Sequence, residues 1–414
     1  MSEGGRRVVV LGAGVVGMAC ALYLQQAGFR VTVIDRNGPG EGCSKGNAGV
    51  FAIDHVIPLA APGILRDVPG MLFDPLGPLR IHWRYLPRLM PWLFRFLAAA
   101  RPRRAEEVSQ ALAALLGSAL DAWRPLLAQS KAEKLVRTGG WLVVYRSEKR
   151  YRAAAWERAW IQRLGVRIED LSTEALHQFV PALDPAVRFG ARFPEAEFSV
   201  NSYELVQAMA AAFVGAGGAI QRAEVKQAGA DDAGVWVKTD EGENRSDMLV
   251  LAMGAWSGPL AAQLGNPVPL DTERGYHVTL PQSGVEIPCP IMSGDYKMIA
   301  TPMNVGLRFA GTVEFAGLEA PPDYRRARVM VERGRRVFRS LDDTGATEWM
   351  GFRPTLPDFL PVIGRSPKFD NVLFAFGHQH LGLTLAGITG RVITDLASGR
   401  APELNLEPYR IERF

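Results

Sequence analysis

The N-terminal stretch of the chain alternates between short, unbroken apolar runs and a helical spacing of apolar residues. Residues 8–11 are all apolar, which is typical of a strand buried on both faces of a parallel sheet. Residues 19–24 then carry apolar positions at helical spacing, the pattern ends at Gly28, and a second β-branched run follows over 31–34. This order predicts a strand–helix–strand unit.

Three glycines stand between the first predicted strand and the helix, and an acidic residue ends the second strand. Gly12, Gly14 and Gly17 have the G-x-G-x-x-G spacing, and Asp35 follows Gly17 by eighteen residues. Such glycines allow a tight turn and close approach to a pyrophosphate, while the acid binds a ribose hydroxyl. The alternative is an ordinary crossover without a ligand. We predict a bound dinucleotide, contacted here by Gly12, Ala13, Gly14, Val15, Val16, Gly17, Asp35 and Arg36.

A loop rich in glycine and small polar residues, 38–51, follows directly after the predicted ribose-binding strand. Its composition alone would suit a surface loop. Its position instead favours a loop folded over the cofactor. There Ser44, Asn47, Ala48 and Gly49 offer side chains and backbone N–H groups to phosphate or ring oxygens.

Two later segments repeat the pattern of a buried strand that opens onto a glycine turn. A strand over 248–251 leads into 253–257, where a backbone can approach a cofactor. A strand over 371–376 leads through a turn, 377–382, into a helix whose N-terminus would stabilise negative charge on a flavin ring. The candidate cofactor contacts in these later parts of the chain are Val225, Gly254, Trp256, Gly377, His378, Gly382, Leu383 and Thr384.

Between these segments lies a long insertion with both kinds of pattern, which a simple NAD domain does not explain. Strands are predicted over 138–146, 219–223, 235–239 and 274–280, and within 297–311. Helices are predicted over 106–127, 149–164, 202–213 and 325–341.

Residues 79–104 combine aromatic residues, leucines and arginines, and two prolines interrupt them. They lack an uncharged run of about 18 residues, so we do not expect them to span a membrane. One interpretation is a broken helical segment packed on the domain. The other is an interfacial patch that contacts lipid through Trp83, Trp92, Phe94 and Phe96, and anionic headgroups through Arg84, Arg88, Arg95 and Arg101.

Composition narrows the class of protein. The chain has 414 residues, 48% hydrophobic and 22% charged, which is typical of a folded protein of two domains. The formal net charge is only +4. The Arg-rich helix predicted over 325–341 is interpreted as a solvated face, so we expect no nucleic-acid partner. Three cysteines give no disulfide framework. We expect a cytoplasmic protein without a signal peptide, and no metal, because His378 and His380 lack further ligands at suitable spacing.

Six motifs in one order resemble a known family. They are GAGVVG at 12–17, SKGNAG at 44–49, RGY at 274–276, YKMIAT at 296–301, GFRPTLPD at 351–358 and GHQHLGLT at 377–384. This order resembles the FAD-dependent D-amino-acid oxidase and glycine oxidase superfamily, and above all the bacterial D-amino-acid dehydrogenase small subunit. The resemblance covers essentially the whole chain. It implies non-covalent FAD, deamination of a D-amino acid to its 2-oxo acid by hydride transfer, and electron delivery to a quinone or the respiratory chain.

The resemblance also assigns residues to the substrate. It implies that Arg353 binds the substrate carboxylate and that Tyr276 and Tyr296 assist. His277 and His380 are candidates for orienting groups or proton acceptors. Gln379, His380 and His277 depart from the family pattern where a substrate side chain would lie. A cyclic substrate such as D-proline or a D-hydroxyproline is therefore our hypothesis.

We predict an α/β protein with a discontinuous Rossmann-like FAD-binding domain, 1–54, 196–262 and 348–414. A second, α+β substrate domain, 55–195 and 263–347, is built on a mainly antiparallel sheet. Peripheral contact with the inner membrane follows from the interfacial interpretation, and the oligomeric state stays open. The alternatives are an O2-using oxidase of the same superfamily, an NAD(P)-linked enzyme, and a non-catalytic FAD-binding subunit of a larger complex.

Overall fold

The apolar run near the N-terminus forms a central strand of a six-stranded sheet in the computed structural model, which describes residues 5–62, 74 and 76–414. Val8 pairs in parallel with Val31 on one side and with Met248 on the other. All neighbouring strands are parallel except the last pair. In spatial order the strands are β10 (Ala219–Arg222), β2 (Arg30–Asp35), β1 (Arg7–Leu11), β14 (Met248–Leu251), β21 (Val372–Phe376) and β20 (Val362–Arg365).

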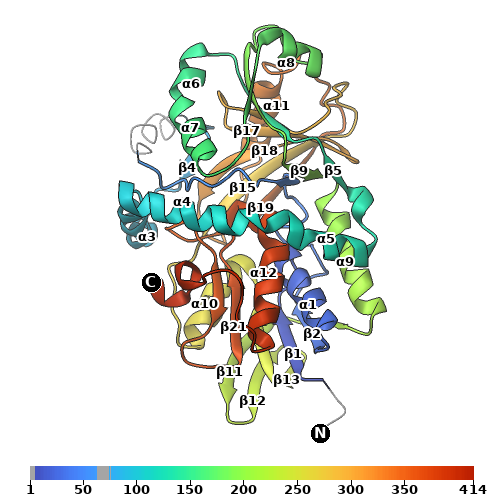
Figure 1. Ribbon diagram of the computed structural model, residues 1–414, viewed down its shortest axis with the longest axis vertical. Coiled ribbons are helices and arrows are strands. Elements are labelled where there is room, and N and C mark those ends of the chain that lie inside the picture. The colour runs from blue at the N-terminus through green and yellow to red at the C-terminus, as the bar shows by residue number, and fades with distance from the viewer. Residues whose placement is uncertain (1–4, 63–73, 75) are drawn as a thin grey trace.

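Both faces of this sheet are covered, as the continuous apolar runs predict. Val8 and Val10 pack into the larger core with the helices, whereas Val9 and Leu11 face the other core. That second core contains α10 (Ser257–Gln263) and a three-stranded antiparallel sheet of β11 (Val225–Asp231), β12 (Gly234–Thr239) and β13 (Gly242–Ser246). The lower half of the molecule in Figure 1 is this three-layered domain.

Helices α1 (Val15–Gln26) and α12 (Gly382–Ala397) lie side by side on the first face of the sheet (Figure 1). A Cβ at Gly390 would lie 2.8 Å from the carbonyl oxygen of Ala19, so the small residue lets the two helices touch. The other helices are α3 (Leu86–Ala99), α4 (Pro102–Gly117), α5 (Ala119–Ser130), α6 (Glu148–Ala153), α7 (Ala155–Arg163), α8 (Thr173–Phe179), α9 (Ser202–Gly215) and α11 (Arg325–Gly334).

The upper half of Figure 1 is built on a nine-stranded, mostly antiparallel sheet. Its path is β19 (Thr347–Thr355), β15 (Asp271–Leu280), β18 (Gly306–Phe315), β17 (Met298–Met303), β16 (Ile291–Ser293), β6 (Trp141–Tyr145), β8 (Phe189–Phe193) and β7 (Glu169–Leu171), and β4 (Leu79–Ile81) pairs with β18. A small sheet of β3 (Val50–Phe51), β9 (Glu197–Ser199) and β5 (Val136–Thr138) lies between the halves. The predicted fold class is confirmed.

The division between the two halves differs from the predicted boundaries at two places. Residues 347–355 form β19 and pair with β15, so they belong to the large sheet and not to the FAD-binding domain. Helices α4 and α5, placed by the sequence in the substrate domain, pack on the FAD-binding domain. The indole of Trp123 donates to the carbonyl of Leu383, and Tyr23 donates to the carbonyl of Ala122. Local patterns do not reveal which domain an amphipathic helix covers.

Several helices and strands also differ from those predicted from the sequence. The predicted helix over 106–127 breaks at Ser118, the helix over 149–164 breaks at Ala154, and the helix over 325–341 ends at Gly334. Strands β11 and β13 were not predicted, because they flank β12 as exposed, polar strands whose stability comes from pairing.

The arginine-rich segment 79–104 contains β4 and α3 and packs on the protein. Trp92 is buried and stacks on Phe96 and against Phe315, so two of the four aromatic residues assigned to lipid turn inward. Trp83 and Phe94 are 74% and 63% exposed.

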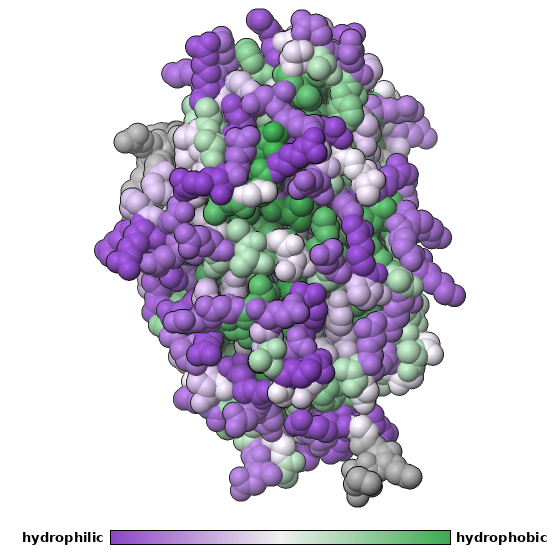
Figure 2. All heavy atoms as spheres, in the orientation of Figure 1, coloured by the Kyte–Doolittle hydropathy of each residue, from purple (hydrophilic) through white to green (hydrophobic). Residues whose placement is uncertain are grey.

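By length and composition alone, one helical stretch of the described residues, 102–130, could cross a membrane. Half of its apolar window is buried, and core helices of soluble proteins pass the same test. Figure 2 shows apolar side chains in the middle of the molecule and polar side chains at both ends.

Candidate active site

The glycine motif lies where β1 ends and α1 begins, at the carboxyl edge of the parallel sheet. Gly12 has φ +105°, and a Cβ there would collide with the carbonyl of Ala252. A Cβ at Gly17 would collide with the carbonyl of Gly12. Helix α1 starts without a side-chain cap or an acidic residue in its first turn. Its N-terminus is therefore available to an anionic group such as a pyrophosphate.

The acid at the end of β2 turns back toward this motif. Asp35 accepts hydrogen bonds from the backbone N–H of Ala13, at 2.8 Å, and of Asn37, at 2.8 Å. Each carboxylate oxygen has further lone pairs, which suit the hydroxyls of a ribose. Beside it, the guanidinium of Arg36 lies 4.0 Å from the ring centre of Trp256.

The loop predicted to cover the cofactor is held from the opposite side. Ser44 accepts a hydrogen bond from the N–H of Val15, 3.0 Å away, which joins the loop to the glycine motif. The carbonyls of residues 44–48 all accept hydrogen bonds from side chains, donated in order by Ser202, Arg308, His277, Arg308 again and Thr301. Three of these donors belong to strands of the large sheet. The N–H groups of Gly46 and Ala48 have no partner among the described residues.

The turn that precedes α12 comes from the other end of the chain and closes the same region. Thr384 accepts a hydrogen bond from the N–H of Ala52 at 3.0 Å, and α12 begins without a side-chain cap. Gln379 is buried at φ +52°, and neither atom of its amide has a hydrogen-bond partner among the described residues. His378 is turned into the helix, where its Nε2 lies 2.9 Å from the hydroxyl of Thr389, and burial lowers its pKa to about 3.

Strand register decides which side chains of the large sheet share a face with this region. β15 and β19 pair without interruption, so Arg353 lies opposite Glu273, Gly351 opposite Gly275, and Trp349 opposite His277. The side chains of these residues project from one face, which is also the face that binds the 44–48 loop. Arg353 therefore faces the predicted cofactor region.

Two features of the backbone fix the position of Arg353. Its Nη1 donates to the carbonyl of Thr312 at 3.0 Å, and its guanidinium lies over Gly275, where a Cβ would collide with it. Thr312 has φ +60°, an uncommon conformation for a β-branched residue, at an irregularity in the pairing of β18 with β15. No carboxylate of the described residues forms an ion pair with Arg353.

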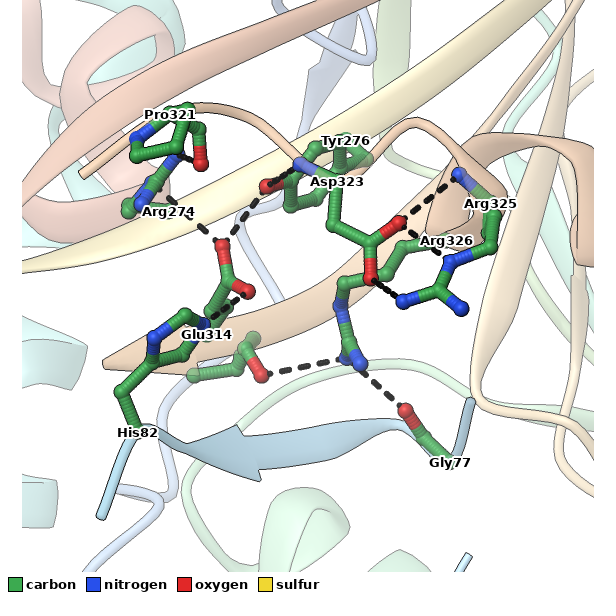
Figure 3. Close-up of polar contacts among 10 residues, drawn as sticks. Gly77, His82, Arg274, Tyr276, Glu314, Pro321, Asp323, Arg325 and Arg326 are labelled. Atoms are coloured by element: carbon green, nitrogen blue, oxygen red, sulfur yellow. Dashed lines mark hydrogen bonds and ion pairs between the residues drawn. The ribbon is translucent and has the colours of Figure 1, made fainter. Parts of the chain in front are cut away.

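Tyr276 lies on the opposite face of the sheet from Arg353. Its hydroxyl donates to Glu314 at 2.6 Å and accepts from the N–H of Asp323 (Figure 3). Glu314 also lies 3.4 Å from the guanidinium of Arg274. Burial and Glu314 raise the pKa of Tyr276. The resemblance implied that Tyr276 assists Arg353 at the substrate, but Arg353 shares a face with its partner Glu273, and Tyr276, three positions further along β15, faces the other way.

Tyr296 and His277 differ in their contacts. Tyr296 is half-buried before β17, and no hydrogen bond of its hydroxyl is found in the described residues. His277 lies on the cofactor face, where its Nδ1 is 3.0 Å from the carbonyl of Gly46 and its ring stacks on Trp349. Burial and the charge of Arg308 lower its pKa to about 3. A neutral His277 that donates to Gly46 positions the loop.

His380 is the candidate proton acceptor that lies close to Arg353. The charge of Arg353 lowers the pKa of His380, although burial has the larger effect. Its Nε2 is 3.0 Å from Nδ1 of His55, a residue that the sequence patterns did not single out. Within the described residues, no group of three or more metal-ligating side chains occurs.

Comparison with known proteins identifies the family of the chain. A family model described as DAO, FAD dependent oxidoreductase, matches residues 7–396. The chain belongs to this family. The D-amino-acid oxidase of Bradyrhizobium diazoefficiens is 38% identical over 423 residues, with 99% of each chain covered. A D-amino acid dehydrogenase of Vibrio vulnificus is 31% identical over 412 residues, covering 96% of this chain and 97% of the relative.

Solved structures of the DAO family share the fold. Glycine oxidase from Geobacillus kaustophilus has a TM-score of 0.73 at 19% identity, with 99% of each chain covered. L-proline dehydrogenase from P. horikoshii has a TM-score of 0.74 at 18% identity, covering 100% of this chain and 98% of that one. FAD is thus the cofactor, as the motifs predicted.

The described residues fit this cofactor. The glycines Gly12 and Gly17, which leave no room for a Cβ, and the starts of α1 and α12, which lack a side-chain cap from their own N-cap residues, lie at one edge of the parallel sheet. Sequence patterns missed Thr312, Arg308 and His55, because each acts through contacts far away in the chain. Val225, a predicted contact, begins β11 where β10 ends, at this same edge.

We expect Asp35→Ala to weaken FAD binding by about 10- to 100-fold. A hydrogen bond to a charged group contributes about 1.5–3 kcal/mol, and the variant also releases the N–H of Ala13. Quenching of flavin fluorescence on titration of the apoprotein measures the affinity, and Asp35→Asn serves as the control that keeps one acceptor oxygen.

Acid precipitation of the wild type should release free FAD. Flavin that remains with the precipitate would contradict non-covalent binding.

Proposed function

We propose that the protein oxidatively deaminates a D-amino acid to a 2-oxo acid and ammonia, with Arg353 as the carboxylate-binding residue. The observation that carries the proposal is the guanidinium of Arg353, which is fixed by Thr312 on the cofactor face and has no carboxylate partner among the described residues. The relatives named D-amino-acid oxidase and D-amino acid dehydrogenase support the substrate class.

A substrate carboxylate beside a flavin must be paired, because an isolated buried charge is very unfavourable. Arginine suits this task, since its planar group binds both carboxylate oxygens and stays charged. Glu273 lies opposite Arg353 but is engaged by the hydroxyl of Thr355, and burial raises the pKa of Glu273. The charge of Arg353 opposes that shift, but no ion pair between the two side chains is found among the described residues, so the guanidinium keeps donors for a substrate carboxylate.

The bound flavin supplies the acceptor for the hydrogen and electron pair that leave the substrate Cα. The chain must orient the substrate, exclude water and leave the amine neutral, because a protonated amine has no lone pair to assist that departure. Arg353 fixes one end of the substrate. The nearby positive charge and desolvation both favour the neutral amine.

We propose a cyclic amino acid such as D-proline or a D-hydroxyproline, since Gln379 and His380 depart from the family pattern at the turn that faces Arg353. Two acceptors are compatible with the family names. A quinone of the respiratory chain suits the dehydrogenases, whereas the higher identity to a protein named D-amino-acid oxidase favours O2.

Anaerobic addition of amino acids to the yellow protein tests the function directly. D-amino acids, and cyclic ones above all, should bleach the flavin, whereas their L-enantiomers should not. The absence of bleaching by the whole panel would favour a non-catalytic FAD-binding subunit. Bleaching by L-amino acids alone would contradict the stereochemistry of the proposal.

Arg353→Ala should lower kcat/KM for amino acids by about two to nearly four orders of magnitude, since breaking a buried charged pair costs about 3–5 kcal/mol. Arg353→Lys should restore little, because lysine lacks the planar fork. Gly275→Ala should also raise KM, because its Cβ displaces the guanidinium without removing it. Steady-state kinetics with acids and their amides measures the effect. If Arg353→Ala still discriminates acids from amides normally, another residue holds the carboxylate.

Contact with a membrane is proposed through the outward side of α3. Trp83 and Arg84 just before this helix, and Arg88, Phe94 and Arg95 on it, are all exposed, a combination that suits anionic lipid. Charge reversal of the three arginines to Glu should reduce sedimentation with anionic vesicles and leave dye-linked turnover unchanged. A wild-type protein that ignores such vesicles and forms stoichiometric hydrogen peroxide in air would be an oxidase instead.

A further inference from the structure

Two histidines from distant parts of the chain form a pair beside the carboxylate-binding arginine. Nδ1 of His55 and Nε2 of His380 are 3.0 Å apart, and the ring centres are 5.1 Å apart. For these two nitrogens to form a hydrogen bond, one of them must carry a proton and the other must accept it. His55 follows β3, whereas His380 belongs to the turn before α12. Nothing in the family description assigns a role to His55.

The His55 end of the pair leads to a buried acid. Nε2 of His55 is 3.9 Å from Oδ2 of Asp54, and Asp54 is only 2% exposed. The other oxygen of Asp54 accepts a hydrogen bond from the indole of Trp141 at 2.9 Å. The edge of the same indole packs against the ring of His55, at 5.6 Å between centres. A positive charge on His55 would therefore be stabilised by Asp54.

The other member of the pair, His380, lies on the side of Arg353 and of the proposed substrate. His380 is partly exposed, whereas its neighbour His378 is buried and bonded to Thr389. Nδ1 of His380 has no hydrogen-bond partner among the described residues. The positive charge of Arg353 disfavours protonation of His380. A carboxylate bound to Arg353 would cancel part of that charge, so His380 becomes a better base when the substrate is bound.

We propose that His380 accepts the proton that the substrate ammonium must lose, and that His55 and Asp54 take up the resulting charge. This inference rests on the proposed function. The substrate N–H bond breaks and the proton moves to Nδ1 of His380, while the electron pair stays on the substrate nitrogen. The proton already on Nε2 of His380 moves to Nδ1 of His55. His55 then carries a proton on both nitrogens and lies next to the carboxylate of Asp54.

The charges around the relay set its pH dependence. Arg353 lies near His380, and Asp54 lies 3.9 Å from His55. Burial raises the pKa of Asp54, the charge of His55 lowers it, and the charge of Glu157 on α7 raises it again. Because the relay works from neutral His380 and burial lowers the pKa of His380, kcat/KM should rise with pH only at the acid end of the profile, below the pH at which an ordinary imidazole loses its proton. Without the relay, only substrate that is already deprotonated in solution reacts, so the profile should move to higher pH.

His380→Asn and His55→Asn test the relay in the FAD-loaded enzyme. Each should lower kcat/KM at neutral pH by about 10²- to 10⁴-fold, the usual contribution of general acid–base catalysis, and the loss should shrink as the pH rises. His177→Asn is the matched control. His177 is half-buried, contacts the carbonyl of Val187, and lies on α8 at the far end of the molecule (Figure 1). Its profile should equal that of the wild type.

Asp54→Asn provides a second test that keeps the acceptor of Trp141. It should lower kcat/KM less than His55→Asn and shift the profile in the same direction. Calorimetry with propionate, measured in two buffers of different ionisation enthalpy, should show proton uptake by the wild type that both histidine variants lose. Variant profiles parallel to that of the wild type would overturn the relay while the proposed function stands. A wild type that no D-amino acid bleaches would overturn both.

Discussion

The site depends on the way the large sheet holds the loop at 44–48. Every carbonyl of these five residues is bonded by a side chain, and Arg308, His277 and Thr301 supply most of these bonds from the second domain. Arg308 is buried, and burial lowers its pKa to about 10. Buried donors and carbonyls are costly to leave unpaired, so the loop has one stable position. That position joins the two domains and leaves the N–H groups of Gly46 and Ala48 without a partner among the described residues.

Side chains alternate between the two faces of the large sheet, so each face carries its own set of residues. The face that holds the loop carries Arg353 and His277, and it is the face on which we propose that the substrate binds. The other face carries Arg274, Tyr276 and Glu314, a buried network that continues to His82 and Asp323 (Figure 3). Such a network stabilises the strand from behind. A change of one residue in register would exchange the two faces, so the pairing of β15 with β19 determines which arginine lies on the face of the 44–48 loop.

Five non-glycine residues among those described have positive φ, and two of these lie beside groups of the candidate site: the carbonyl of Thr312 accepts a hydrogen bond from Arg353, and Gln379 precedes His380. The carbonyl of Thr312 positions the guanidinium, and Gln379 lies in the turn that presents His380. Positive φ in such residues persists only where the surroundings impose it, and it is often found at functional sites.

The sequence by itself determined the local units of this protein. The strand–helix–strand unit with Gly12, Gly17 and Asp35, the second glycine turn and the C-terminal helix N-terminus are all encoded within short windows, because turn geometry and apolar spacing are local properties. The ordered motifs also predicted the family and predicted FAD as the cofactor. Tertiary structure alone decided that Tyr276 turns away from Arg353, that α4 and α5 cover the FAD-binding domain, and that His55 meets His380. These outcomes depend on strand register and on contacts between residues hundreds of positions apart, and such contacts leave no pattern in a local stretch of sequence.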